Sequence, residues 1–182
     1  STTTVSASDM FTKRDLDSGY DESKATKIKL SDSKTTVSGD GAKFSSENGV
    51  NTVTITKEGT YILSGKLNGQ VVVDTDKTAK VQIVLKGATV SGKSTAAIYV
   101  KQADKVFLTL APNSENILTE TGEFASDNSS TVDGVIFSKD DLSINGTGLL
   151  KISTESGHGV VSKDDPVIAS GTIEIKSSGH GL

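Results

Sequence analysis

A four-residue motif occurs twice in the second half of the chain, and it restricts the possible folds more than any other feature. Ser138-Lys-Asp-Asp and Ser162-Lys-Asp-Asp begin 24 residues apart, and each follows a short run of β-forming residues. A second pair, Gly157-His-Gly and Gly179-His-Gly, begins 22 residues apart. A glycine-punctuated β repeat of this length is typical of one coil of a solenoid, in which each coil stacks on the one before it.

The same pattern extends towards the N-terminus. Each unit reads as a strand, a short polar corner, a second strand, a glycine turn and often a third strand. Alignment of Asp74, Lys101, Lys139 and Lys163 gives coil spacings of 27, 38 and 24 residues, and the longest spacing contains a polar insertion at residues 112–131. Long loops on a regular coil are where binding function tends to lie.

These spacings predict an all-β fold, namely a right-handed single-stranded parallel β-helix with coils of about 22–27 residues. A β-sandwich is the alternative, because short strands and glycine turns also suit that architecture. Sandwich hairpins, however, do not predict that a motif recurs at the length of one coil. The repeat therefore favours the solenoid.

Composition agrees with a solenoid and excludes several classes of function. Only 34% of the 182 residues are hydrophobic, which suits a thin line of core aliphatics better than a thick globular core. No cysteine is present, so disulfides and thiolate metal sites are excluded. The net charge is −4 without a basic stripe, which argues against nucleic acid as a partner. No apolar run reaches the length of a membrane span.

The chain divides into two parts by composition. Residues 1–25 are polar, and we interpret them as an N-terminal tail or linker from which Met10, Phe11 and Leu16 dock on the first coil. Residues 26–182 would form the β-helix domain. The chain ends as another coil begins, and an open coil exposes strand edges. We therefore expect the domain to be truncated at its C-terminal end, with self-association through the open coil as one way to cover it.

The two Lys-Asp-Asp triplets supply candidate metal ligands. In coils stacked about 4.7–4.9 Å apart, Asp140 would lie over Asp164, and Asp141 would lie over Asp165. Carboxylates at that distance repel each other unless a cation neutralises them, and Ca²⁺ accepts oxygen ligands in loose geometry. Asp133 could complete the calcium shell. The alternative is a solvated corner turn in which lysines pair with the aspartates.

Four further residues are candidate ligand-binding residues. Lys139 and Lys163 form a ladder beside the aspartates, and His158 and His180 recur in the Gly-His-Gly turns. The histidines could bind a metal or a sugar hydroxyl, although a structural stack of imidazoles is the simpler interpretation. Aromatic residues make up only 4% of the chain, and their alternating strand positions assign most of them to the core. No residue is set apart as a catalytic base, and the one arginine, Arg14, precedes the coils.

Several segments resemble a known family. They are Met10-Phe-Thr-Lys-Arg-Asp-Leu-Asp, Tyr20-Asp-Glu-Ser-Lys-Ala-Thr-Lys-Ile, and the Ser-Lys-Asp-Asp coils. Together they are similar to the clostridial carbohydrate-binding domain family of the pectate-lyase-like β-helix superfold. The resemblance implies a non-catalytic β-helix that holds Ca²⁺ and binds plant cell-wall polysaccharide, including cellulose and acidic galacturonan. Members are extracytoplasmic, are frequently lipoproteins, and generally continue with further coils.

Our leading hypothesis is therefore an extracellular or cell-surface carbohydrate-binding protein without catalytic activity, stabilised by calcium. Its partner would be a polysaccharide, and a lipid anchor could lie upstream of residue 1. The first alternative is a cell-surface adhesin or structural stalk that binds a protein. The second is a calcium-dependent polysaccharide lyase.

Overall fold

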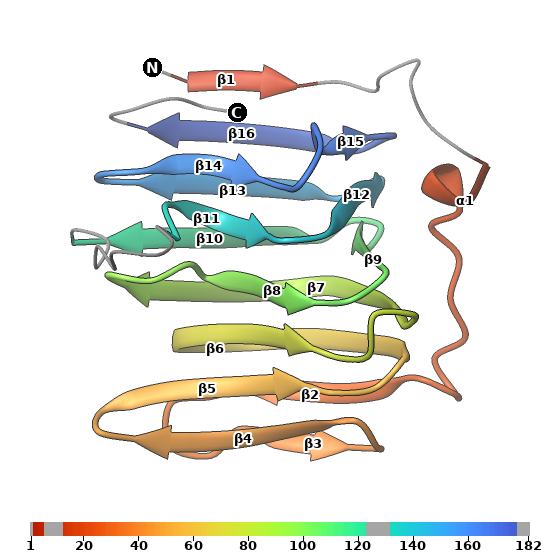
Figure 1. Ribbon diagram of the computed structural model, residues 1–182, viewed down its shortest axis with the longest axis vertical. Coiled ribbons are helices and arrows are strands. Elements are labelled where there is room, and N and C mark those ends of the chain that lie inside the picture. The colour runs from red at the N-terminus through yellow and green to blue at the C-terminus, as the bar shows by residue number, and fades with distance from the viewer. Residues whose placement is uncertain (1, 6–12, 123–131, 178–182) are drawn as a thin grey trace.

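The computed structural model of the chain describes residues 2–5, 13–122 and 132–177, and these residues form an all-β fold (Figure 1). The helix in this part is a single turn, α1 (Lys13–Leu16). The strands are β1 (Thr2–Val5), β2 (Thr26–Leu30), β3 (Thr36–Ser38), β4 (Ala42–Glu47), β5 (Val50–Ile55), β6 (Gly59–Asp74), β7 (Lys80–Lys93), β8 (Ile98–Gln102), β9 (Lys105–Leu110), β10 (Glu115–Thr121), β11 (Gly134–Ser138), β12 (Asp141–Gly146), β13 (Leu149–Thr154), β14 (His158–Val161), β15 (Val167–Ile168) and β16 (Thr172–Ser177).

Most strands pair in parallel and form three stacks. Stack 1 contains β2, the beginnings of β6 and β7, then β9, β12 and β15. Stack 2 contains the middle of β6, the end of β7, then β10, β13 and β16. Stack 3 contains β5, the end of β6, then β8, β11 and β14. The chain passes through stacks 1, 2 and 3 in turn and then returns to stack 1, which gives a curled, mainly parallel sheet.

The antiparallel pairs in the described residues lie at the margins of this sheet. They are β2 with β3, β4 with β5, and β1 with β16. A β-sandwich is built from antiparallel sheets, so the observed pairing does not support that alternative. In Figure 1, β1 lies beside β16 at the end of the molecule opposite β3 and β4. Part of the edge that we expected to be open is therefore paired within the chain.

The strand register in stack 3 follows the spacings read from the sequence. Val72 pairs with Tyr99, Tyr99 with Phe137, and Phe137 with Val161, which reproduces the spacings of 27, 38 and 24 residues. Of the four positions used for the alignment, Asp74 leaves this register, at an irregularity in the pairing of β6 with β8. The repeated motif therefore marks equivalent positions in successive coils.

Alternation along each strand places aliphatic residues in a shared core. In β2, Thr26, Ile28 and Leu30 are buried, whereas Lys27 and Lys29 between them are exposed. This period of two is what a pleated strand with one buried face requires. In stack 3 the equivalent inward column comprises Val71, Ile98, Ile136 and Val160.

Tyr61 belongs to this core and is only 2% exposed. Its hydroxyl donates a hydrogen bond to the carbonyl oxygen of Lys57 at 2.6 Å. Gly41 lies against the ring with a φ of +89°, and a Cβ atom there would lie 2.1 Å from the Tyr61 hydroxyl oxygen. Glycine is therefore required at position 41 both by the backbone conformation and by the close approach.

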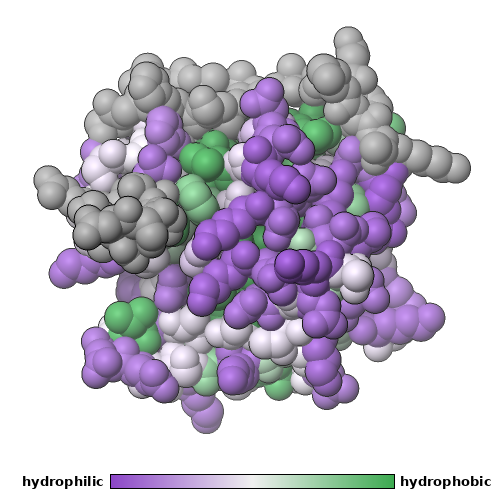
Figure 2. Space-filling model, viewed as in Figure 1, coloured by the Kyte–Doolittle hydropathy of each residue, from purple (hydrophilic) through white to green (hydrophobic). Residues whose placement is uncertain are grey.

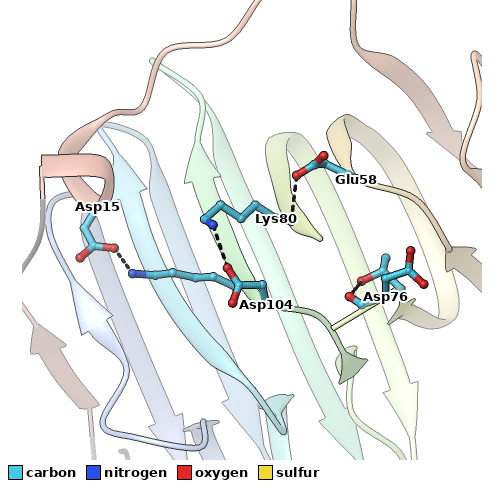
Figure 3. A network of polar contacts seen from close by, with 7 residues as sticks. Asp15, Glu58, Asp76, Lys80 and Asp104 are labelled. Atoms are coloured by element: carbon cyan, nitrogen blue, oxygen red, sulfur yellow. Dashed lines mark hydrogen bonds and ion pairs between the residues drawn. The ribbon is translucent and has the colours of Figure 1, made fainter. Parts of the chain in front are cut away.

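The N-terminal segment lies across the outer face of stack 1. We predicted a polar tail, but residues 14–25 contact the sheet, and α1 lies beside stack 1 in Figure 1. The Asp15 carboxylate is 1% exposed and lies 2.5 Å from the Lys105 ammonium (Figure 3). Leu16 is 47% exposed, so its side chain does not dock as expected. Met10 and Phe11 lie outside the described residues.

A ladder of polar side chains explains why this segment adheres to stack 1. The Gln82 amide donates to the Thr109 hydroxyl at 3.0 Å, and the Thr109 hydroxyl donates to the Asn145 side-chain oxygen at 2.6 Å. The Asn145 amide then donates to the backbone carbonyls of Asp15 and Asp17 at 2.9 and 3.1 Å. Buried polar groups require such partners, and the covering segment supplies them.

Candidate functional site

A charged groove lies at the corner where the chain passes from stack 3 back to stack 1. Its volume is about 430 Å³. The charged residues that line it are Lys77, Lys101, Lys139 and Lys163, together with Asp104, Asp140 and Asp141. We call this region the lysine groove. Successive coils contribute lysines to it, and the repeated motif occupies this corner in the two coils that supply Lys139 and Lys163.

The serine of the repeated motif closes each corner turn. The Ser138 hydroxyl donates to the Asp140 carbonyl oxygen at 2.7 Å and accepts from the Asp140 backbone N–H at 3.2 Å. In the next coil, the Ser162 hydroxyl donates to the Asp164 carbonyl oxygen in the same way. Serine commonly stabilises turns through such local bonds. These two coils therefore share the same turn at this corner, whereas the preceding coil has Val100 at the position of Ser138.

The Asp140 carboxylate joins neighbouring coils. Its Oδ2 atom accepts a hydrogen bond from the Ala103 backbone N–H at 3.0 Å, in the preceding coil. Asp104, in that same corner, pairs with Lys80 at 2.8 Å (Figure 3). Asp104 is thus neutralised by a lysine from outside the groove, so the four groove lysines exceed the two remaining groove aspartates.

The predicted calcium ligands are only partly brought together. Ser143 pairs with Val167, which places Asp141 and Asp165 one coil apart, as the sequence indicated. Nevertheless, no three His, Asp or Glu side chains in the described residues are grouped closely enough to hold a metal ion. The charged lining of the groove also includes four lysines. The described residues therefore do not fit a calcium site built from protein carboxylates alone.

Asp133 and the histidines lie away from the groove. Asp133 precedes β11, whereas Asp140 follows it, so the length of the strand separates the two carboxylates. The Asp133 Oδ2 atom lies 3.6 Å from His158 Nε2, and both side chains are about one-third exposed. The structure thus pairs Asp133 with His158 rather than with the groove aspartates. His180 lies outside the described residues.

Two aromatic side chains adjoin the groove on the outer face of stack 3. Tyr99 and Phe137 are paired across neighbouring strands, and their ring centroids lie 6.0 Å apart at an interplanar angle of 65°. Both side chains are half-buried. The Lys139 ammonium lies 5.8 Å from the Tyr99 ring centroid. An edge-to-face aromatic pair next to a row of lysines offers apolar and cationic contacts side by side.

Sequence reasoning missed this pair because it assigned most aromatic residues to the core. Tyr61 is indeed buried in the core. Tyr99, in contrast, lies between the buried residues Ile98 and Val100, so strict alternation requires it to face outward. Phe137 likewise lies between the buried residues Ile136 and Ser138, so the same alternation requires it to face outward.

The face that carries these residues is partly open to solvent. Strands β5, β8, β11 and β14 lie in front in Figure 1. In the same view, Figure 2 shows hydrophilic residues in a continuous run up this face, with hydrophobic patches beside it.

In the part of the chain that the structure describes, no helix is long and apolar enough to cross a membrane.

Comparison with known proteins adds independent information about this region. A protein of Acetivibrio thermocellus, described as a carbohydrate-binding domain-containing protein, is 35% identical over 128 residues, which are 69% of this chain and 45% of that protein. The chain thus spans less than half of that relative. A solved structure of a polysaccharide lyase-like protein from C. thermocellum, a gadolinium derivative, superposes on this chain with a TM-score of 0.63 at 30% sequence identity. The matched region is 75% of this chain and 60% of the chain in that structure.

The sequence profile that matches the chain has the same description as the Acetivibrio protein. It covers residues 49–182, and this range contains both the lysine groove and the Tyr99–Phe137 pair. The match extends over more than half of the chain. The chain therefore belongs to the family of carbohydrate-binding domain-containing proteins.

Proposed function

We propose that the chain is a right-handed single-stranded parallel β-helix that binds polysaccharide on the outer face of stack 3. The order in which the chain visits the three stacks supports the β-helix, and parallel crossover connections are almost always right-handed. The observation that carries the function is the half-buried aromatic pair of Tyr99 and Phe137 beside the exposed Lys101, Lys139 and Lys163. Family membership supports the class of ligand.

The chemistry of this face favours an acidic polysaccharide such as galacturonan. Aromatic rings contact the apolar C–H faces of sugars, and lysine ammonium groups attract carboxylates as point charges. Two of the groove aspartates are bonded to protein partners, Asp104 to Lys80 and Asp140 to the Ala103 N–H. Only the bond to Lys80 neutralises an aspartate, and the four groove lysines then exceed the two remaining groove aspartates, so the net charge that the groove offers to a ligand is positive. Cellulose, which has no charge, would use the aromatic pair alone.

Binding without catalysis is the activity that we favour. The groove lysines repeat from coil to coil, and none is set apart as a general base. The likeness to a polysaccharide lyase-like protein makes lyase activity the second candidate. Incubation with polygalacturonate should give no rise in the ultraviolet absorbance of unsaturated product. A rise that persists in highly purified protein would establish the lyase instead.

We further propose an extracellular or cell-surface location, since plant cell-wall polysaccharide lies outside cells. Stabilisation by calcium also stays a prediction, and bound polyuronate could supply oxygen ligands that the described residues lack. An adhesin or stalk would instead bind a protein partner. Retention of the chain by polygalacturonate but not by cell-surface protein would separate these two alternatives.

The proposal is tested by isothermal titration with polygalacturonate at low and high salt. We expect binding that weakens as salt increases, because exposed charges are screened. The triple variant Lys101→Gln, Lys139→Gln, Lys163→Gln should lose most of this binding.

The matched control changes three exposed lysines outside the groove, Lys34→Gln, Lys43→Gln and Lys66→Gln. This triple variant removes the same charge and should bind as the wild type does. Equal loss in both triple variants would show that net charge, rather than this face, governs binding. No binding of any polysaccharide by the wild type would overturn the proposal.

A further inference from the structure

We infer that the polysaccharide lies across the strands, along the direction in which the coils stack, in single file with one uronate residue for each coil. This inference rests on the proposed function and adds an orientation, a charge density and a minimum length of ligand. Three rows of side chains carry it. Each row runs from coil to coil at one position along the strands of stack 3 and the corner that follows.

The first row is apolar. It comprises the outward residues Val72, Tyr99, Phe137 and Val161, which the strand register places in adjacent coils. All four are half-buried. A row of this kind suits the C–H faces of successive sugar rings, since apolar contact is favourable along its whole length.

The second row is cationic and lies two residues after the first row, within β8 and in the corner turns that follow β11 and β14. Lys101, Lys139 and Lys163 occupy it, and all three are exposed. The three lysines line one groove, and the Lys139 ammonium lies 5.8 Å from the Tyr99 ring centroid, so this row runs beside the aromatic one. In the coil before Lys101, Asp74 leaves the register at an irregularity, and Lys77 reaches the groove from the corner turn.

The third row is acidic and lies beyond the lysines. Asp141 and Asp165 are exposed and lie one coil apart, as the pairing of β12 with β15 shows. Asp164, also exposed, lies in the same corner as Asp165. These carboxylates can accept hydrogen bonds from sugar hydroxyls, but they repel a second row of negative charge. The three rows together fit a polymer with one carboxylate per sugar and exclude densely sulfated chains.

The spacing of the coils fixes the orientation. Neighbouring strands lie about 4.7–4.9 Å apart, which is close to the advance of an extended pyranose chain per residue. A chain across the strands therefore passes the lysines of several coils, and its carboxylates can contact more than one of them. A chain parallel to the strands would meet the lysine of one coil only. Affinity should thus increase with length, because each further contact forms within a ligand that is already bound.

Titration with oligogalacturonates of increasing length tests the orientation. We expect affinity to increase roughly fivefold with each residue up to about four residues, the number of coils that contribute lysines to the groove, and then to level off. Lys139→Gln, in the middle of the row, should reduce the affinity for the tetramer while hardly changing that for the dimer. Lys66→Gln is the matched control outside the groove.

The acidic row is tested separately with dextran sulfate as the probe. The double variant Asp141→Asn, Asp165→Asn should gain affinity for dextran sulfate and keep its affinity for polygalacturonate. Equal affinities for dimer and tetramer, or dextran sulfate binding by the wild type as strong as its polygalacturonate binding, would overturn the inference. Polygalacturonate binding itself would survive either result, and only its complete absence would also remove the proposed function.

Discussion

The outer faces of stacks 1 and 3 begin from similar residues and end in different environments. On stack 1, Phe107 is 1% exposed, and the ammonium of Lys105, from the same strand, lies 5.2 Å from its ring centroid. On stack 3, Tyr99 is half-buried, and the Lys139 ammonium lies 5.8 Å from its ring centroid. Both faces thus carry an aromatic ring beside a cation. The chain covers the first with its own N-terminal segment and leaves the second accessible.

The difference shows that the role of an outward-facing residue depends on whether another segment of the chain covers it. Beneath the N-terminal segment, the polar ladder that ends at Asn145 is fully hydrogen-bonded, and such bonding contributes to stability. On stack 3 the lysines face water, where isolated exposed charges contribute little to stability. We therefore expect changes on the covered face to alter folding and changes on the open face to alter binding.

The largest effect should come from Asn145→Ala on the covered face. The change leaves the carbonyls of Asp15 and Asp17 and the hydroxyl of Thr109 without their partner. Because several buried polar groups lose a bond, we expect a loss of about 3 kcal/mol in the free energy of unfolding. Urea denaturation followed by circular dichroism measures it. Lys139→Ala on the open face is the comparison, and a similar loss there would break the distinction between the faces.

The next effect concerns Asp140, whose carboxylate joins two coils. Asp140→Ala removes the hydrogen bond to the Ala103 N–H, so we expect a loss of about 1.5 kcal/mol in the free energy of unfolding. The loss should be the same with calcium and with a chelator if Asp140 acts through this bond. A loss confined to the calcium sample would show instead that Asp140 acts through a bound ion. The exposed Asp164→Ala serves as the matched change in the next coil.

A smaller effect, dependent on pH, is expected at Tyr61. Burial raises the pKa of the Tyr61 phenol above its ordinary value near 10. The folded state thus holds this proton more tightly than the unfolded state. The resulting stability is complete below pH 10 and is lost as the pH rises through the raised pKa.

Tyr61→Phe should cost about 1 kcal/mol at neutral pH, because the bond to the Lys57 carbonyl is lost. The variant should also lose less stability than the wild type on alkaline titration, as thermal melts from neutral pH upward would show. Tyr99→Phe on the open face is the control for both measurements. An alkaline loss that is unchanged in Tyr61→Phe would contradict the assignment.

The smallest effect is expected at the exposed pair that also ties the N-terminal segment to the sheet. The hydrogen bond and charge of Lys86, 2.8 Å away, lower the pKa of Glu22. The contribution of this pair is therefore present above the ordinary pKa of a glutamate and is lost as the pH falls through the lowered value. Lys86→Gln should raise the pKa of Glu22 in an NMR titration without a measurable change in melting temperature at neutral pH. A clear drop in melting temperature would show instead that this pair, like Asn145, contributes to the stability of the fold.

Sequence reasoning predicted the fold well where a pattern repeats. The recurrence of Ser-Lys-Asp-Asp gave the 24-residue register that the pairs Phe137–Val161 and Ser143–Val167 display. In the stacks of parallel strands, the sequence spacing is carried directly into the strand register, so a repeated corner residue identifies a repeated corner. The antiparallel hairpin of β4 and β5 was not predicted, because it lies outside the repeat.

The candidate site was harder to predict because its roles depend on partners from other coils. The hydrogen bond from the Ala103 N–H to Asp140 joins residues that are 37 positions apart, so no local sequence pattern predicts it. Asp133 was placed with the aspartates on proximity in sequence, but a strand runs between them. The attachment of residues 14–25 depends on Asn145, which lies 130 residues from Asp15.

The burial of Asn145 has a consequence for production of the protein in eukaryotic cells. Asn145-Gly-Thr matches the acceptor pattern for N-linked glycans, and attachment would use the side-chain amide nitrogen. In the folded chain that nitrogen is buried and donates to two backbone carbonyls, so a glycan cannot be added after folding. A glycan added earlier, in the secretory pathway, would keep the N-terminal segment off the sheet. Expression in bacteria, or in the cytosol of eukaryotic cells where no N-linked glycan is attached, avoids this misfolded glycoform. The glycoform would otherwise be mistaken for evidence that the protein itself is unstable.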